Sequence, residues 1–309
     1  ACAINSAAGT FGSETSRDLV TDSVVYKGKL FVSVSETDAA AVYRYDAGTT
    51  WTLVTYTTVG EIASDGSDAT NIDAIKMAVW NGKLYLGSQS AANTGALYVS
   101  STADTTANTF TLVNTTRGTF ATANMDGVSD LVVWNGGLYV ATQEANLAEI
   151  VRYDGGTTFT QVSGTDGQID NLASVTVDSV IMAVYEGRLF AGMQTGGNAA
   201  RVSVYEGNGA TWTALTTAVG TIGAQTNVDD ISDLEAWNGS LFAATGETDA
   251  ARIYRWSVSG NATSNTATNW LSIVTGTGQI ASTDGATTVD RAVLQTYNGR
   301  LYSGISTNA

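Results

Sequence analysis

A six-residue motif recurs six times along this 309-residue chain. Each copy carries an aromatic residue, a turn that contains glycine, then leucine and a second aromatic residue, and the copies span 26–31, 80–85, 134–139, 185–190, 237–242 and 297–302. The motif leucines are Leu30, Leu84, Leu138, Leu189, Leu241 and Leu301, so successive copies lie 54, 54, 51, 52 and 60 residues apart. A repeat of this length is typical of solenoids and propellers, in which copies of one structural unit pack side by side in a row or around a ring.

The turn of the motif predicts a β-hairpin. Four of the six copies place Asn-Gly between two apolar runs, which favours the type I′ turn because both central residues need a positive φ. We therefore expect hairpins near residues 24–36, 78–90, 131–143, 182–194, 235–247 and 294–306.

Each repeat contains four short segments with strand character. In the third copy these are Asp130–Trp134, Leu138–Gln143, Glu149–Asp154 and Thr158–Ser163, termed strands a, b, c and d. Four strands in about fifty residues are typical of a propeller blade. The sequence therefore predicts an all-β chain that folds as one six-bladed β-propeller over residues 1–309, with a β-solenoid or sandwich as the alternative.

The repeat resembles two known propeller families. Its hairpin, followed by a Tyr and a Trp around a polar turn at Tyr45–Trp51 and Tyr205–Trp212, resembles a kelch repeat, although the usual glycine doublet is absent. The same turn resembles the Asp-box of sialidase-type propellers through Asp46, Gly48 and Trp51, with Arg44 in place of the leading serine. These resemblances imply an architecture and leave the function open.

Odd and even repeats differ, so the repeating unit is a pair. Odd repeats are one residue longer before the motif and carry Asp22, Asp130 or Asp233 there. Their b–c loops hold candidate binding residues at equivalent positions: Glu36, Asp38, Glu144, Asn146, Glu247 and Asp249. Three equivalent glycan-binding pockets, with Trp and Tyr as stacking platforms, are one interpretation, and a duplication without functional meaning is the other.

The two ends of the chain predict an incomplete sixth blade. Residues 1–11 align with 110–120 and read as a strand d, whereas the chain stops after strand b of the sixth repeat. The expected slot for strand c is bordered by Cys2, Ile4, Leu301 and Tyr302. Unpaired strand edges recruit other strands, which leaves three alternatives for the slot. A strand from a second copy of the chain fills it, a segment that is cleaved or not included in this sequence fills it, or it stays open.

Charge restricts the partners. The chain has 29 acidic and 14 basic residues, a net charge of −15, which argues against nucleic acid because phosphates require a basic face. Acidic loops give weak calcium candidates at Asp65, Asp68, Asp229 and Asp230, and no other cofactor is expected.

Composition also argues against most catalytic sites. Histidine is absent, which excludes Ser-His-Asp and Cys-His arrangements, and a sialidase would need several arginines that converge on one carboxylate. Low charge and abundant threonine favour an extracellular or cell-surface location without membrane insertion. The sequence thus predicts first a non-enzymatic surface protein that self-associates into an assembly or filament, second a lectin, and third a sialidase-like glycosidase.

Overall fold

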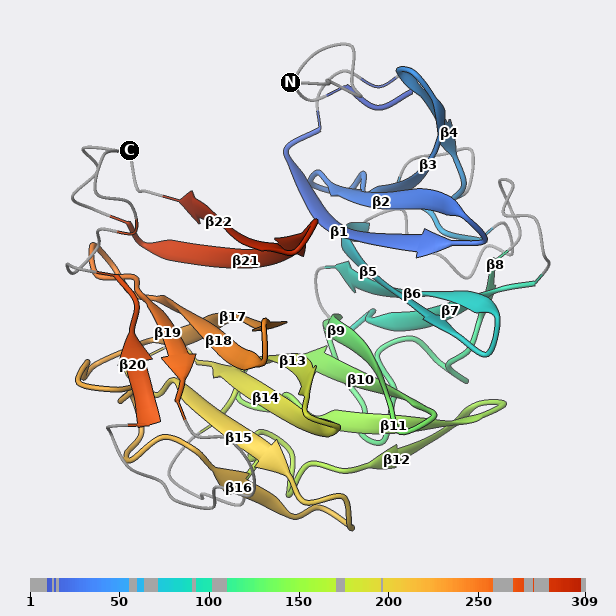
Figure 1. Ribbon diagram of the computed structural model, residues 1–309. Helices are drawn as coiled ribbons and strands as arrows, with labels where there is room; N and C mark the ends of the chain where they lie inside the picture. Colours follow the sequence, from blue (N-terminus) through green and yellow to red (C-terminus); the bar gives the residue numbers. More distant parts are fainter. Residues whose placement is uncertain are drawn as a thin grey trace. The chain divides into compact units, whose positions relative to one another are not determined.

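A computed structural model describes the strands of this chain and most of their connections (Figure 1). It describes residues 10–12, 14, 17–55, 60–63, 72–90, 93–101, 110–170, 176–195, 197–257, 269–274, 280 and 289–306. Within these residues the secondary structure is β, without an α-helix, as predicted. No helix in the described part is long and apolar enough to cross a membrane.

The chain divides into two compact units, and unit 1 comprises residues 1–143 and 151–160. Its first sheet is antiparallel and has the order β1 (Leu19–Tyr26), β2 (Lys29–Ser35), β3 (Ala41–Ala47) and β4 (Thr50–Leu53). The second has β5 (Ile72–Trp80), β6 (Lys83–Ser90), β7 (Ala96–Ser100) and β8 (Phe110–Leu112). Then come β9 (Gly127–Trp134), β10 (Gly137–Gln143), β11 (Ile150–Gly155) and β12 (Thr158–Gln161), of which only Ile150 and Gln161 belong to unit 2.

Unit 2 comprises residues 144–150 and 161–309 and repeats the same order. One sheet has β13 (Ser179–Tyr185), β14 (Arg188–Gln194), β15 (Arg201–Tyr205) and β16 (Trp212–Ala214). The next has β17 (Asp230–Trp237), β18 (Ser240–Gly246), β19 (Ile253–Trp256) and β20 (Trp270–Ser272). The last described pair is β21 (Arg291–Tyr297) with β22 (Arg300–Ser306).

The six hairpin turns have the backbone geometry that the sequence predicts. In each turn a residue with φ between 46° and 49° precedes a glycine with φ between 70° and 78°. Lys27 and Glu186 adopt the same conformation as the four asparagines, so the glycine and the strand pairing suffice to set the turn.

The first aromatic residue of the motif connects neighbouring repeats. In unit 1 the Tyr26 hydroxyl donates to the Gly82 carbonyl at 3.0 Å, and the Trp80 indole donates to the Gly136 carbonyl at 2.8 Å. In unit 2 the same bond joins Trp237 to Gly299 at 3.0 Å. The apolar residues of adjacent sheets pack into cores between them, so the motif stabilises sheet-on-sheet packing and the hairpin together.

The additional residue of the odd repeats is a β-bulge. The register of β1 against β2 shifts between Val20 and Asp22, and that of β17 against β18 shifts between Ile231 and Asp233. The Asp233 carboxylate accepts the N–H of Leu234 at 2.8 Å and that of Leu294, in the next repeat, at 2.6 Å. The odd–even difference therefore has a structural role in aligning consecutive strands.

Several predictions fall outside the described residues. Cys2 and Ile4, which the sequence places beside an open slot, are among these, as are the calcium candidates Asp65 and Asp68. The count of six blades and the closure of the last one by residues 1–11 stay predictions.

Candidate functional site

Three b–c loops are held by an aspartate at the start of strand a of the following repeat, or directly before it. The N–H of Asp38 donates to Asp73 at 2.8 Å, as do the N–H of Asn146 to Asp178 and of Asp249 to Asp290, both at 2.7 Å. The three donors have φ between 56° and 59°, a conformation that Asn and Asp tolerate. Asp38, Asn146 and Asp249 therefore fix their loops through their backbone N–H groups, and three aspartate carboxylates are the acceptors.

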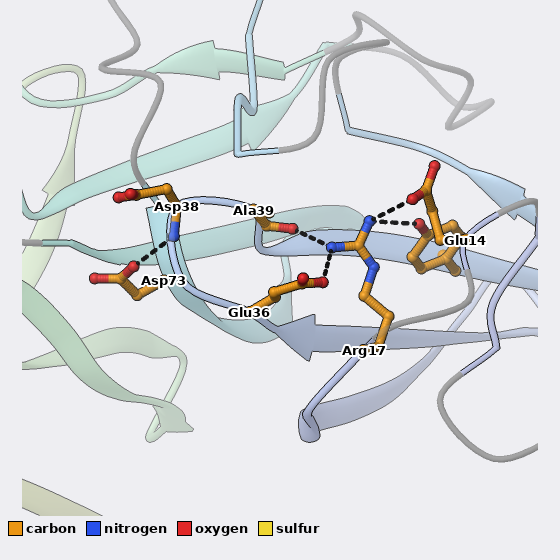
Figure 2. A network of polar contacts seen from close by, with 7 residues as sticks. Glu14, Arg17, Glu36, Asp38, Ala39 and Asp73 are labelled. Atoms are coloured by element: carbon orange, nitrogen blue, oxygen red, sulfur yellow. Dashed lines mark hydrogen bonds and ion pairs between the residues drawn. The ribbon is translucent and has the colours of Figure 1, made fainter.

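Glu36 is engaged in an ion-pair network in unit 1 (Figure 2). The Arg17 guanidinium contacts the Glu36 carboxylate at 2.9 Å and Glu14 at 3.4 Å, and it donates to the Ala39 carbonyl at 2.7 Å. The Arg17 side chain is only 2% exposed, so its charge depends on these partners. This network gives Glu36 a structural role.

Gln225 takes the place of Arg17 in unit 2. Its amide donates to the Ala250 carbonyl at 2.9 Å and accepts from the Tyr254 hydroxyl at 3.0 Å. In unit 1 the Arg17 guanidinium contacts both the loop and the Glu36 carboxylate. In unit 2 the residue that contacts the loop is a neutral amide, so it forms no ion pair with Glu247. Equivalent positions in the sequence thus acquire different surroundings.

Glu144 makes the same backbone contacts as Glu247, and the difference in its loop lies in the Asn146 side chain. The Glu144 N–H donates to the Asp178 carbonyl at 2.9 Å and its carbonyl accepts from Leu147 at 3.1 Å, while the Asn146 side chain accepts from the Thr176 hydroxyl at 2.5 Å. The three loops that the sequence treats as equal therefore differ in their side-chain contacts.

Glu247 lines a polar surface cavity of about 280 Å³ in unit 2 that is widely open to solvent. The cavity lies where strands of consecutive repeats meet, since Gly246 of β18 pairs with Arg291 of β21. Its lining residues are Asp229, Asp230, Gly246, Glu247, Thr248, Asp290, Arg291 and Ser306. Backbone bonds fix the wall: Glu247 donates to the Asp290 carbonyl and Asp290 donates to the Ser306 carbonyl, each at 2.9 Å.

Two carboxyl groups of this cavity, those of Asp230 and Glu247, have a raised pKa. Burial raises the pKa of the Asp230 carboxyl above its usual range, although the Arg291 guanidinium, 3.5 Å away, opposes the shift. Burial and the neighbouring Asp229 also raise the pKa of Glu247. Such shifts occur where carboxyls are crowded and partly withdrawn from water, which is common at binding and catalytic sites.

Sequence reasoning identified Glu247 but did not identify Arg291 or Asp290 as its neighbours. Asp230 occupies the position that Leu19 and Gly127 occupy in the other odd repeats. This additional carboxylate in only one of the three repeats was the sequence signal that could have distinguished the Glu247 loop from the other two. Asp229 and Asp230, the weak calcium candidates, line the same cavity, yet no group of three or more potential metal ligands occurs in the described part of the chain.

Two strand-c arginines form local pairs. Arg44 contacts Asp46 at 2.9 Å and Arg152 contacts Asp154 at 2.7 Å. These arginines are therefore occupied within their own turns, and the cavity at Glu247 has a single arginine among its lining residues.

Neither a protein-family model nor a curated protein matches the sequence. Solved structures do. A Trypanosoma rangeli sialidase in complex with 2,3-difluoro-KDN superimposes with a TM-score of 0.57 at 16% identity over 96% of this chain and 52% of the sialidase chain. The SapL1 lectin in complex with alpha methyl fucoside gives a TM-score of 0.53 at 11% identity over 92% of this chain and 87% of the lectin.

At these identities the similarity establishes the fold alone, which is propeller-like and similar to that of sialidases. The chain spans about half the length of the sialidase chains that it matches. The kelch resemblance stays untested.

Proposed function

We propose that this chain is a carbohydrate-binding protein whose ligand occupies the cavity at Glu247. The observation that carries the proposal is the composition of that cavity: four carboxylates, one guanidinium and two hydroxyl side chains around about 280 Å³. Sugar hydroxyls donate to carboxylates and accept from guanidinium and hydroxyl groups, so this lining suits a polyol. Ligand pockets start at about 300 Å³, and a cavity near that lower end suits a single sugar ring.

The rigidity of the wall supports the same proposal. Asp290 is held by the N–H of Asp249 through its carboxylate and by two backbone bonds through its own main chain. Asp229 donates its N–H to the Glu247 carboxylate at 3.2 Å. Polar groups that are already oriented lose little entropy when a ligand binds, which favours affinity for a small, hydrated molecule.

The proposal is compatible with the lectin that shares the fold, since that structure contains alpha methyl fucoside and most of its length is matched. The sequence suggested three equivalent glycan-binding pockets, whereas the proposal places binding at one loop. Binding is expected at the Glu247 loop, whereas the Glu36 loop is engaged by Arg17.

A glycan array followed by calorimetry tests the proposal. Glu247→Gln removes a charge from the cavity wall and is expected to weaken binding of any positive glycan at least tenfold. Asp249→Asn is the matched control, because Asp249 lies on the same loop but contributes its backbone N–H. An array without positive glycans, or equal affinities for Glu247→Gln and the wild type, contradicts the proposal.

Glycoside hydrolysis is a second candidate. The raised pKa values of Asp230 and Glu247 are the feature that favours it, because a general acid must hold its proton near neutral pH. The single arginine of the cavity argues against a sialidase-type site. Release of nitrophenol from a panel of chromogenic glycosides, lost in Glu247→Gln, would establish the enzyme over the lectin.

Self-association into filaments, calcium binding and an extracellular location stay predictions of the sequence.

A further inference from the structure

Three Asn-X-Ser/Thr triplets occur in the sequence, and they begin at Asn114, Asn238 and Asn261. Such a triplet is the acceptor sequence for N-linked glycosylation, in which a glycan is attached to the side-chain amide of the asparagine. Asn261 lies outside the described residues. Asn114 and Asn238 have opposite surroundings, so the structure distinguishes the two as acceptors.

The side-chain amide of Asn114 is part of the fold of unit 1. Asn114 is only 4% exposed. Its Oδ1 atom accepts the N–H of Leu97 at 2.6 Å, and its Nδ2 atom donates to the Thr119 carbonyl at 2.6 Å. A glycan on Nδ2 would replace this last bond and would need space that a buried amide does not have. Asn114 is therefore a structural residue.

Asn238 lies at the tip of the β17–β18 hairpin in unit 2 and is exposed. Its side chain forms no hydrogen bond with any part of the chain that the structure describes. The turn itself is held by its backbone, because the Gly239 carbonyl accepts from the Tyr185 hydroxyl at 2.8 Å and Trp237 pairs with Ser240. A modification of the Asn238 amide would therefore break no contact that supports the hairpin.

Ser240 distinguishes this turn from the three other Asn-Gly turns of the repeat. All four have the same geometry, with φ of the asparagine between 46° and 48°. The residue after Asn-Gly is Lys83, Gly137 or Arg300 in the other three turns. The acceptor triplet needs a hydroxyl at this position, so the β17–β18 turn alone among the four fulfils it.

We propose that Asn238 is the acceptor of an N-linked glycan when the chain passes through a secretory membrane that contains an oligosaccharyltransferase. The donor is an oligosaccharide linked to a polyprenyl diphosphate. Nδ2 of Asn238 attacks the anomeric carbon of the first sugar, and an N-glycosidic bond forms. The bond from that carbon to the diphosphate oxygen breaks, the polyprenyl diphosphate leaves, and a base of the transferase takes the Nδ2 proton.

This modification goes beyond the proposed glycan binding. Asn238 and the Glu247 cavity lie at opposite ends of β18, whose seven residues span about 20 Å. A glycan that is covalently attached at the turn therefore leaves the cavity open.

The test expresses the full chain behind a signal peptide in a eukaryotic secretory host and maps the peptides of the folded, secreted product by mass spectrometry. Glycans are released enzymatically in heavy-oxygen water, which labels the formerly glycosylated asparagine and separates it from spontaneous deamidation at Asn-Gly. The label is expected at Asn238 and not at Asn114. Ser240→Ala is expected to lose the label at Asn238, and Ser240→Thr, which keeps a hydroxyl, is expected to retain it.

Gly137→Ser is the matched positive control, because it completes the triplet at Asn135 in a turn of the same geometry. A Cβ atom on Gly137 would lie 3.3 Å from the Tyr139 ring, so serine fits after a small movement of that ring. This variant is expected to gain a second label, at Asn135. A wild type without a glycan at Asn238, or a glycan retained there in Ser240→Ala, would overturn the proposal.

Discussion

A Cβ atom on Gly246 would lie 2.2 Å from Oδ1 of Asp230, so glycine is what allows this carboxylate to stand in the cavity. Gly246 also pairs with Arg291, the residue whose guanidinium contacts Asp230. One position without a side chain therefore brings the acid and the base of the cavity together.

Gly246→Ala is expected to displace the Asp230 carboxylate and to abolish binding at the cavity. Because the displaced atoms are the end of a side chain, the cost in folding stability should stay near 1 kcal/mol. Gly197→Ala is the control, since a Cβ there meets nothing within 4 Å. Calorimetry with a positive glycan and urea unfolding separate the two effects; retained affinity in Gly246→Ala would show that Asp230 is not part of the binding site.

Glu36→Gln is expected to lower stability without affecting glycan binding. The substitution removes one carboxylate from the buried Arg17 guanidinium, and a charged hydrogen bond of this kind contributes about 1.5–3 kcal/mol. Urea unfolding measures the loss. If Glu36→Gln instead weakens glycan binding as much as Glu247→Gln does, the three loops act as equivalent pockets, and the assignment to one cavity is wrong.

Asp22 should make stability depend on pH. Burial raises its pKa to about 6 from an ordinary value of 3.8, against the opposing influence of Lys76 and the N–H of Met77. The folded chain thus holds a proton that the unfolded chain releases in this interval. The Asp22 contribution is fully present below pH 3.8 and is lost as the pH rises through 6.

The difference in unfolding free energy between wild type and Asp22→Asn should therefore shift in favour of the wild type as the pH falls from 6 to 4. Asp46→Asn is the control, because Arg44 and Thr52 lower the pKa of Asp46 to about 2 and its titration lies outside that interval. A pH-independent difference for Asp22→Asn would contradict the raised pKa.

The buried indole bonds between strands d should contribute measurably to stability. Trp212 donates to the Val162 carbonyl at 2.7 Å, and Trp212→Phe leaves that buried carbonyl without its donor, at a cost of about 1–3 kcal/mol beyond lost packing. Trp256→Phe removes the same atoms from a side chain that is also 5% exposed, but whose indole has no hydrogen bond in the described part of the chain. Equal losses in urea unfolding would show that packing alone explains the effect.

The sequence was sufficient to predict the hairpins, because Asn-Gly and its variants determine the turn locally. It was also sufficient to separate odd from even repeats, although the bulge at Asp233 and its bond to Leu294 became visible only in three dimensions. Such a bond joins residues that are far apart in the chain, and no local pattern encodes it.

The cavity was harder to predict. Glu36, Glu144 and Glu247 occupy equal positions in the repeat, so periodicity alone assigned them equal roles. Their difference arises from non-equivalent neighbours. Arg17 contacts the Glu36 loop, and Thr176 contacts the Glu144 loop through Asn146. Gln225 contacts the Glu247 loop, beside which Asp230 and Arg291 line the cavity.

A crystal structure of the chain with a glycan selected from the array tests the central claim most directly. We expect a sugar ring in the cavity, with its hydroxyls hydrogen-bonded to Glu247, Asp290 and Arg291. A ring bound at the Glu36 loop or on the β21–β22 hairpin, with the cavity empty, would contradict it.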